Sequence, residues 1–171
     1  MHIKEETIER HTLSVTVDNE AGILARIAGL FTARGYNIES LTVADVTEDE
    51  SVSRITIVTN GSAYAIEQII AQLDRLVPVH SVLDLTTFGP HVERELALVK
   101  VAGSGDHRIE ALRLADVYRA RVIDATTSSF IFEVTGGSDK IDTFVGLMRE
   151  VGLVEVARTG IVAITRGKSA H

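Results

Sequence analysis

Cysteine is missing from this sequence of 171 residues, and its absence excludes several kinds of chemistry. Without a thiol the chain cannot form a disulfide framework, bind a metal through thiolates or use a cysteine nucleophile. Long apolar runs are missing too: none approaches the roughly 20 residues that a membrane-spanning helix needs. The N-terminal stretch MHIKEETIER is too charged to be the apolar core of a signal peptide. We therefore expect a cytoplasmic protein.

Basic residues are scarce, because 17 Lys and Arg stand against 24 Asp and Glu and give a formal net charge of −7. Such a surface repels a phosphate backbone, so we expect no nucleic acid partner. The sequence holds no G-x-S-x-G or H-E-x-x-H motif, and its six histidines show no spacing typical of metal ligands. We predict no catalytic residue and no metal site.

Strand and helix patterns alternate through the first half of the chain, and a hydrophobic content of 45% is sufficient for a packed core. Leu13, Val15 and Val17 alternate with polar residues, as in a half-buried strand. Helical spacing follows, up to a glycine placed to end the helix. The predicted order is βαββαβ, with apolar positions at Thr12–Val17, Ala21–Arg34, Ile38–Val46, Val52–Thr59, Ile66–Leu76 and Val79–Thr86.

The same order begins again after Phe88-Gly89-Pro90. Its predicted elements are Leu96–Val101, Arg108–Tyr118, Val122–Ala125, Phe130–Val134, a helix capped by Ser138, and an extended stretch Val154–Ile164. We predict an α+β fold with two ferredoxin-like βαββαβ domains, residues 1–88 and 89–171. Because Leu96–Val101 carries apolar side chains on both sides, the second face of its sheet should be covered, and we expect a homodimer.

The loop Asp18-Asn19-Glu20-Ala21-Gly22 joins the first strand to the first helix. Its backbone amides lie at the positive end of that helix, where they can bind a carboxylate, and a glycine lets a ligand approach the main chain. The alternative is ordinary helix capping, with Asn19 as the N-cap. Asn37 favours a ligand site, because an asparagine offers both a donor and an acceptor to an amino acid.

Two further stretches have weaker claims to a site. Gly103-Ser104-Gly105-Asp106-His107-Arg108 lacks the third glycine of a dinucleotide-binding motif, so a plain loop is expected. The acidic group Asp45, Glu48, Asp49 and Glu50 could attract a divalent cation, but a solvated hairpin tip is the favoured interpretation.

A family resemblance rests on longer stretches. "TVDNEAGILARIAGLFTARGYNIESLTVA" resembles an ACT domain, a small amino-acid-sensing module, and more closely the regulatory small subunit of acetolactate synthase. The resemblance continues through "SRITIVT", "QLDRLVPV", "HVERELALVKV" and "VEVARTGIVAITRG", and so covers nearly the whole chain. It implies that the domain of residues 1–88 is an ACT domain, and that the second domain is a ferredoxin-like regulatory domain.

The resemblance also implies a valine site at the interface of two paired ACT domains. In that picture the amides around Ala21 and Gly22 receive the valine carboxylate, and two asparagines orient its polar end. The residues that match the site are Asn19, Glu20, Ala21 and Gly22, with Asn37 and Ile38 reaching from the partner subunit.

As the family implies, the chain is not an enzyme but a subunit that binds the catalytic large subunit, raises its activity and confers feedback inhibition by valine. Thiamine diphosphate, Mg²⁺ and FAD are expected on the large subunit, which condenses pyruvate with a second 2-oxo acid. Two alternatives stay open. One is a free-standing ACT pair that senses another amino acid and controls another enzyme or a transcription factor; the other is a catalytic ferredoxin-like scaffold.

Overall fold

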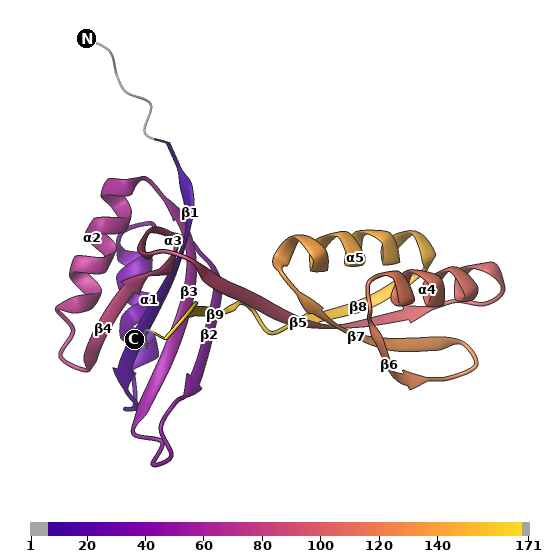
Figure 1. Cartoon of the computed structure of the whole chain (residues 1–171), viewed down its shortest axis with the longest axis horizontal. Helices are drawn as coiled ribbons and strands as arrows, with labels where there is room; N and C mark the ends of the chain where they lie inside the picture. Colours follow the sequence, from indigo (N-terminus) through magenta and orange to yellow (C-terminus); the bar gives the residue numbers. More distant parts are fainter. Residues whose placement is uncertain (1–6, 169–171) are drawn as a thin grey trace, which may run out of the picture. The chain divides into compact units, whose positions relative to one another are not determined.

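A computed structural model describes residues 7–168, and contacts between residues divide them into two units (Figure 1). The second unit is Glu93–Gly160. The first combines the described residues up to Val92 with those from Ile161 onward. No helix within residues 7–168 is long and apolar enough to span a membrane.

The first unit has the predicted βαββαβ order. Its elements are β1 (Glu9–Asp18), α1 (Ile23–Ala33), β2 (Ile38–Asp45), β3 (Val52–Gly61), α2 (Ala63–Asp74) and β4 (Val79–Asp84). They form an antiparallel sheet in the order β2-β3-β1-β4, so β2 and β4 are its edges. One difference from the prediction is a short helix, α3 (Leu85–Phe88), in place of the end of the last strand. Asp84 caps it by accepting a hydrogen bond from the Thr86 amide at 3.0 Å.

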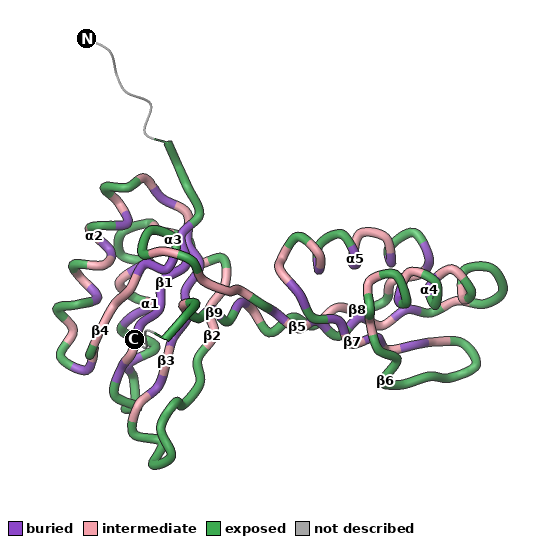
Figure 2. The backbone as a smooth tube through the Cα atoms, viewed as in Figure 1, coloured by how far each residue is buried: buried purple, intermediate pink, exposed green. Residues whose placement is uncertain are grey.

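One face of this sheet packs against α1 and α2. Leu13, Val15 and Val17 on β1 are fully buried and share a core with Ile27 and Phe31 of α1, and buried positions follow β1 and β3 in Figure 2. Helix α1 ends where predicted, at Gly35, whose φ is 68°. There two backbone amides bond back to the last helical turn, at 3.0 and 3.1 Å, as in a Schellman motif.

The other face of the first sheet is met by the C-terminal segment of the chain. The Ile161 amide donates to Ser40 Oγ at 2.8 Å, and Thr42 Oγ1 donates to the Ile161 carbonyl at 3.0 Å. Ile161 keeps only 4% of its surface exposed, and the strand after it, β9 (Val162–Thr165), pairs with β5 (His91–Ala102). These contacts join Ile161 to β2, so the C-terminal end of the predicted 89–171 domain groups with the first unit.

The second unit repeats the topology of the first. Its elements are β5, α4 (Asp106–Val117), β6 (Arg121–Ala125), β7 (Ser129–Gly136), α5 (Ser138–Val151) and β8 (Leu153–Arg158). The sheet order β6-β7-β5-β8 matches β2-β3-β1-β4 strand for strand. The two predicted ferredoxin-like folds are thus confirmed, with both helices of each unit on one face of its sheet (Figure 1).

One local prediction in the second unit is wrong. The N-cap of α5 is Gly137, while Ser138 is already helical and its hydroxyl donates to the buried Glu95 carboxylate at 3.2 Å. The predicted final extended stretch is confirmed as two strands, β8 and β9, which are separated by residues 159–161 and both pair with β5. The core itself is aromatic, with the Phe132 and Phe144 rings edge to face at 6.3 Å between centroids.

Candidate functional site

The loop between β1 and α1 leaves the start of the helix open. The N-cap residue is Gly22, with φ of 87°. It has no side chain that could accept a hydrogen bond from the first amides of the helix. The alternative interpretation, with Asn19 as the N-cap, is therefore wrong. The first turn of α1 contains no acidic residue, so the partial positive charge of the helix end is not offset there.

The same loop is held from two sides by neighbouring turns. The Asn19 amide donates to the Ser51 carbonyl at 2.8 Å, and its side-chain Nδ2 donates to the Glu50 carbonyl at 2.9 Å. On the other side the Asp18 amide donates to the Pro78 carbonyl at 2.8 Å. The Asp18 carboxylate lies 2.6 Å from Nε2 of His80. The loop is therefore fixed in position while its surface stays exposed to solvent.

The space around Gly22 suits a small anionic group. A Cβ placed on this glycine would meet no atom within 4 Å, so a ligand can approach the main chain. Glu20 is the nearest acid in the loop, and its carboxylate lies 3.8 Å from Nη1 of Arg26. Backbone amides at an uncapped helix end bind carboxylates well, because donors and dipole act in the same direction. The arrangement can hold the carboxylate of an amino acid.

The remaining two predicted site residues lie at the opposite end of the sheet. Ile38 pairs with Thr59 on β3, whereas Asp18 pairs with Val52 on the same strand. The seven residue steps between those positions span about 23 Å at ~3.3 Å per residue. Asn37 precedes Ile38, and its carbonyl accepts a hydrogen bond from Thr59 Oγ1 at 2.6 Å. A single chain thus brings together Asn19, Glu20, Ala21 and Gly22, but not Asn37 and Ile38.

Two carboxylates at the acidic turn between β2 and β3 accept hydrogen bonds from nearby serines. Asp49 accepts from the Ser51 hydroxyl at 2.7 Å and from the Ser51 amide at 3.2 Å. Hydrogen bonds from the Ser51 and Thr47 side chains lower the pKa of Asp49 to about 2. Asp45 accepts from the Ser53 hydroxyl at 2.8 Å. Nowhere in residues 7–168 do three or more His, Cys, Asp or Glu side chains form a group that could hold a metal ion.

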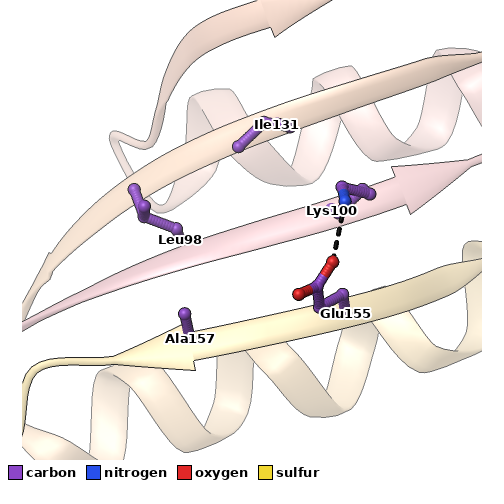
Figure 3. A pocket seen from close by; sticks show the side chains of 5 residues that line it. All are labelled: Leu98, Lys100, Ile131, Glu155 and Ala157. Atoms are coloured by element: carbon purple, nitrogen blue, oxygen red, sulfur yellow. Dashed lines mark hydrogen bonds and ion pairs between the residues drawn. The ribbon is translucent and has the colours of Figure 1, made fainter.

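A depression lies on the second sheet, on the face opposite α4 and α5 (Figure 3). Lys100 and Glu155 face each other across β5 and β8 and form an ion pair at 2.7 Å. The hydrogen bond from Lys100 lowers the pKa of Glu155. The other lining residues are apolar: Leu98, Ile131 and Ala157. A carboxylate held ionised by a lysine among aliphatic side chains suits a protein contact better than proton transfer.

Sequence reasoning missed the residues that fix the loop. Glu50, Ser51 and Pro78 act through their carbonyl groups, which any residue type provides, so no sequence pattern could have revealed them. Glu50 has a further mark, a φ of 55° that is unusual for a residue with a side chain. The sequence shows His80, but it does not show that the partner of this histidine is Asp18, which is 62 residues away.

These features define a class: two ferredoxin-like units, the first with an open, exposed helix start after its first strand, as in ACT-domain proteins. Residues 13–81 match the family model described as an AHAS small subunit-like ACT domain, and residues 94–167 match the small subunit of acetolactate synthase. The chain belongs to the family of acetolactate synthase small subunits.

Similar proteins agree over almost their whole length. The probable acetolactate synthase small subunit of Archaeoglobus fulgidus is 48% identical over 158 residues, covering 92% of this chain and 98% of the relative. The acetolactate synthase isozyme 3 small subunit of Escherichia coli is 48% identical over 159 residues, covering 92% and 96%. The crystal structure of the Thermotoga maritima small subunit superposes with a TM-score of 0.85 at 36% identity, covering 94% of this chain and 99% of that one.

Proposed function

We propose that this chain is the regulatory subunit of an acetolactate synthase, that it activates the catalytic subunit and that it confers feedback inhibition by valine. It carries out no reaction itself. Thiamine diphosphate, Mg²⁺ and FAD belong to the catalytic subunit, and both subunits are cytoplasmic. Valine binding changes the activity of the partner through a coupling free energy, about 1–3 kcal/mol for typical allosteric pairs.

The observation that carries the proposal is the uncapped, uncompensated start of α1 at Gly22. A free α-amino acid has a carboxylate for the helix amides and an ammonium group for an oxygen acceptor. Asn19 supplies that acceptor, because its Nδ2 is already bonded to Glu50 and its Oδ1 remains. Valine then needs only a small apolar wall for its branched side chain.

A second copy of the chain completes the site. β2 is an edge strand, and antiparallel pairing with β2 of a partner would place the beginning of one strand beside the end of the other. The end of β2, Asp45, pairs with Ser53, close to the Asn19 end of the sheet. The partner's Asn37 and Ile38 would therefore arrive at that end. This pairing removes the separation found within one chain.

Exposed apolar side chains on β2, just after it and on α1 support a dimer. Val43 and Val46 keep 42% and 48% of their surfaces exposed, and Leu24 on α1 keeps 41%. In the second unit Leu98 is 37% exposed on the open face of its sheet. Burial of such side chains gives about 25 cal/mol for each Å² removed from water.

The proposed valine site can be tested with two isosteric variants at one position. Asparagine and aspartate both tolerate a positive φ, so Gly22→Asn and Gly22→Asp place the same shape at the helix start and differ in charge. We expect Gly22→Asp to weaken valine binding by at least about tenfold relative to Gly22→Asn, because two carboxylates would then meet at one helix end. Calorimetry gives the affinities.

Reconstitution with the catalytic subunit separates activation from inhibition. Both variants should raise the activity of the catalytic subunit as the parent does, while Gly22→Asp should lose sensitivity to valine. Equal inhibition of Gly22→Asp and the parent would contradict the site. Binding of serine, glycine or phenylalanine without valine would favour a free-standing sensor of another amino acid, and turnover by the isolated chain would favour a catalytic scaffold.

A further inference from the structure

The turn between β2 and β3, residues Thr47–Ser51, is bonded more densely than a solvated hairpin tip requires. The Thr47 hydroxyl accepts from the amides of Ser51 and Val52, both at 3.1 Å. The Glu50 amide donates to the Thr47 carbonyl at 3.1 Å. Together with the bonds from Ser51 to Asp49, these contacts tie the two ends of the turn to each other.

The turn directs two of its carbonyl groups at a single residue of the proposed valine site. The Glu50 carbonyl accepts from the Asn19 side chain, and the Ser51 carbonyl accepts from the Asn19 backbone. Glu50 accepts the first contact with its backbone at φ of 55°. Because Nδ2 of Asn19 is held by this contact, the amide cannot rotate to exchange its two ends. Its Oδ1 is therefore the group offered to a ligand.

We propose that the Thr47–Ser51 turn is a positioning element of the effector site, which orients Asn19 so that its Oδ1 accepts a hydrogen bond from the ammonium group of an α-amino acid. This inference rests on the proposed function. The turn does not touch the ligand. It acts through Asn19, and its own internal hydrogen bonds determine how firmly the acceptor is held.

The same turn stands where the two halves of the site meet. It connects β2, whose first residues follow Asn37, to β3, which lies beside β1. In a dimer paired through β2, the turn of one subunit lies at the end of the sheet where the partner's Asn37 arrives. A shift of the pairing strand is thereby passed to Asn19 through two hydrogen bonds.

Asp49 gives the test, because it supports the turn without contacting the loop. Asp49→Ala removes the acceptor for Ser51, whereas Asp49→Asn keeps an oxygen there and removes the charge. Glu48→Ala is the matched control, since the Glu48 side chain takes part in no hydrogen bond or ion pair within the described residues. Valine affinity of the full chain is measured by calorimetry, and activation of the catalytic subunit is measured without valine.

We expect Asp49→Ala to weaken valine binding by about fivefold to tenfold, the effect of one hydrogen bond, with activation unchanged. Asp49→Asn and Glu48→Ala should bind valine as the parent does. Hydrogen exchange supplies a local readout: the Asn19 amide should exchange faster in Asp49→Ala, while the buried Ile57 amide should not.

Three outcomes would overturn the inference. Parental affinity in Asp49→Ala would show that the turn does not position Asn19. Equal losses in all three variants would show an effect of charge alone. Faster exchange at both Asn19 and Ile57 would show general destabilisation. If the parent chain itself binds no valine, the proposed function fails first, and that result is distinct from a loss confined to Asp49→Ala.

Discussion

The strand-to-helix loops of the two units occupy equivalent places but differ in charge. In the first unit the loop ends at Gly22, and α1 begins without an acid. In the second the loop ends at Gly105, and α4 begins with Asp106. An acid in the first turn neutralises the positive helix end and repels a carboxylate ligand. The same fold therefore leaves the positive helix end without an acid in one unit and places an acid beside it in the other.

The loops also differ in how they are held. The Gly103 amide donates to the Ser128 carbonyl at 3.0 Å, the counterpart of the bond from the Asn19 amide to Ser51. No side chain in the second loop repeats the contact from Asn19 Nδ2 to Glu50. Instead Arg108 lies over the Phe130 ring at 3.8 Å and anchors α4 to the core. The two units share the topology and the backbone contact, whereas the side chains at the two loops make different contacts.

The largest expected effects come from the two separate cores. Phe132→Ala removes a fully buried ring from the second core and should cost about 3–5 kcal/mol of stability. Phe31→Ala does the same in the first core. Calorimetry should show the second unit unfolding at lower temperature in Phe132→Ala, with valine binding retained, and loss of valine binding in Phe31→Ala. A single transition that shifts equally in both would contradict separate cores.

A smaller change in stability is expected on the face of the first sheet that the C-terminal segment covers, and the open face of the second sheet supplies the control. Thr42→Val removes the hydroxyl that donates to the Ile161 carbonyl and should cost about 0.5–1.5 kcal/mol of stability. Thr135→Val is the matched substitution on the second sheet, where the side chain is exposed. Thermal unfolding should be altered only by Thr42→Val. Equal shifts would mean that the hydroxyl contact contributes nothing.

An acid introduced into the first turn of α1 would give this helix the charge that α4 has at its start. Ala25 is exposed in the first turn of α1, and Ala25→Asp introduces the charge that Asp106 gives to α4. A first-turn charge contributes about 0.3–1 kcal/mol, so valine should bind about twofold to fivefold more weakly than to the neutral control Ala25→Asn. Similar affinities in the two variants would contradict the electrostatic account.

The smallest effect concerns the acidic turn. The pKa of Asp49 is lowered to about 2 by hydrogen bonds from Ser51 and Thr47, so its contribution is present above the ordinary value of 3.8 and is lost as pH falls through about 2. Carboxyl NMR should show Asp49 ionised at pH 4, where an ordinary aspartate is about half protonated. The corresponding turn of the second unit, held by Thr126, has no such titration. A midpoint near 4 for Asp49 would contradict the bonded turn.

Local patterns predicted most of the fold, because alternation and helical spacing report which face of each element is buried. Leu13, Val15 and Val17 are examples. Contacts between residues far apart in the sequence produce no comparable local pattern. The bonds from Ile161 to Ser40 and Thr42 join residues about 120 positions apart, so the sequence did not reveal that the C-terminal segment contacts the first sheet. Such contacts become visible only once the sheet is assembled.

The candidate site was predictable in composition but not in geometry. The open helix start follows from Gly22 and from the absence of nearby acids in α1, both of which the sequence contains. The role of Asn19 does not, because its partner is a carbonyl group on a residue 31 positions away. The placement of Asn37 in the site remains a prediction, since it requires a second copy of the chain.

Mixed dimers test the shared site most directly. Each proposed site uses Gly22 from one subunit and Asn37 from the other, so Gly22→Asp and Asn37→Ala homodimers both lack intact sites. A mixed dimer of the two variants regains one. With random assembly after co-expression, calorimetry should find about one quarter of the parental valine sites at parental affinity. No high-affinity binding in the mixture, with each variant folded and dimeric, would contradict a site shared between subunits.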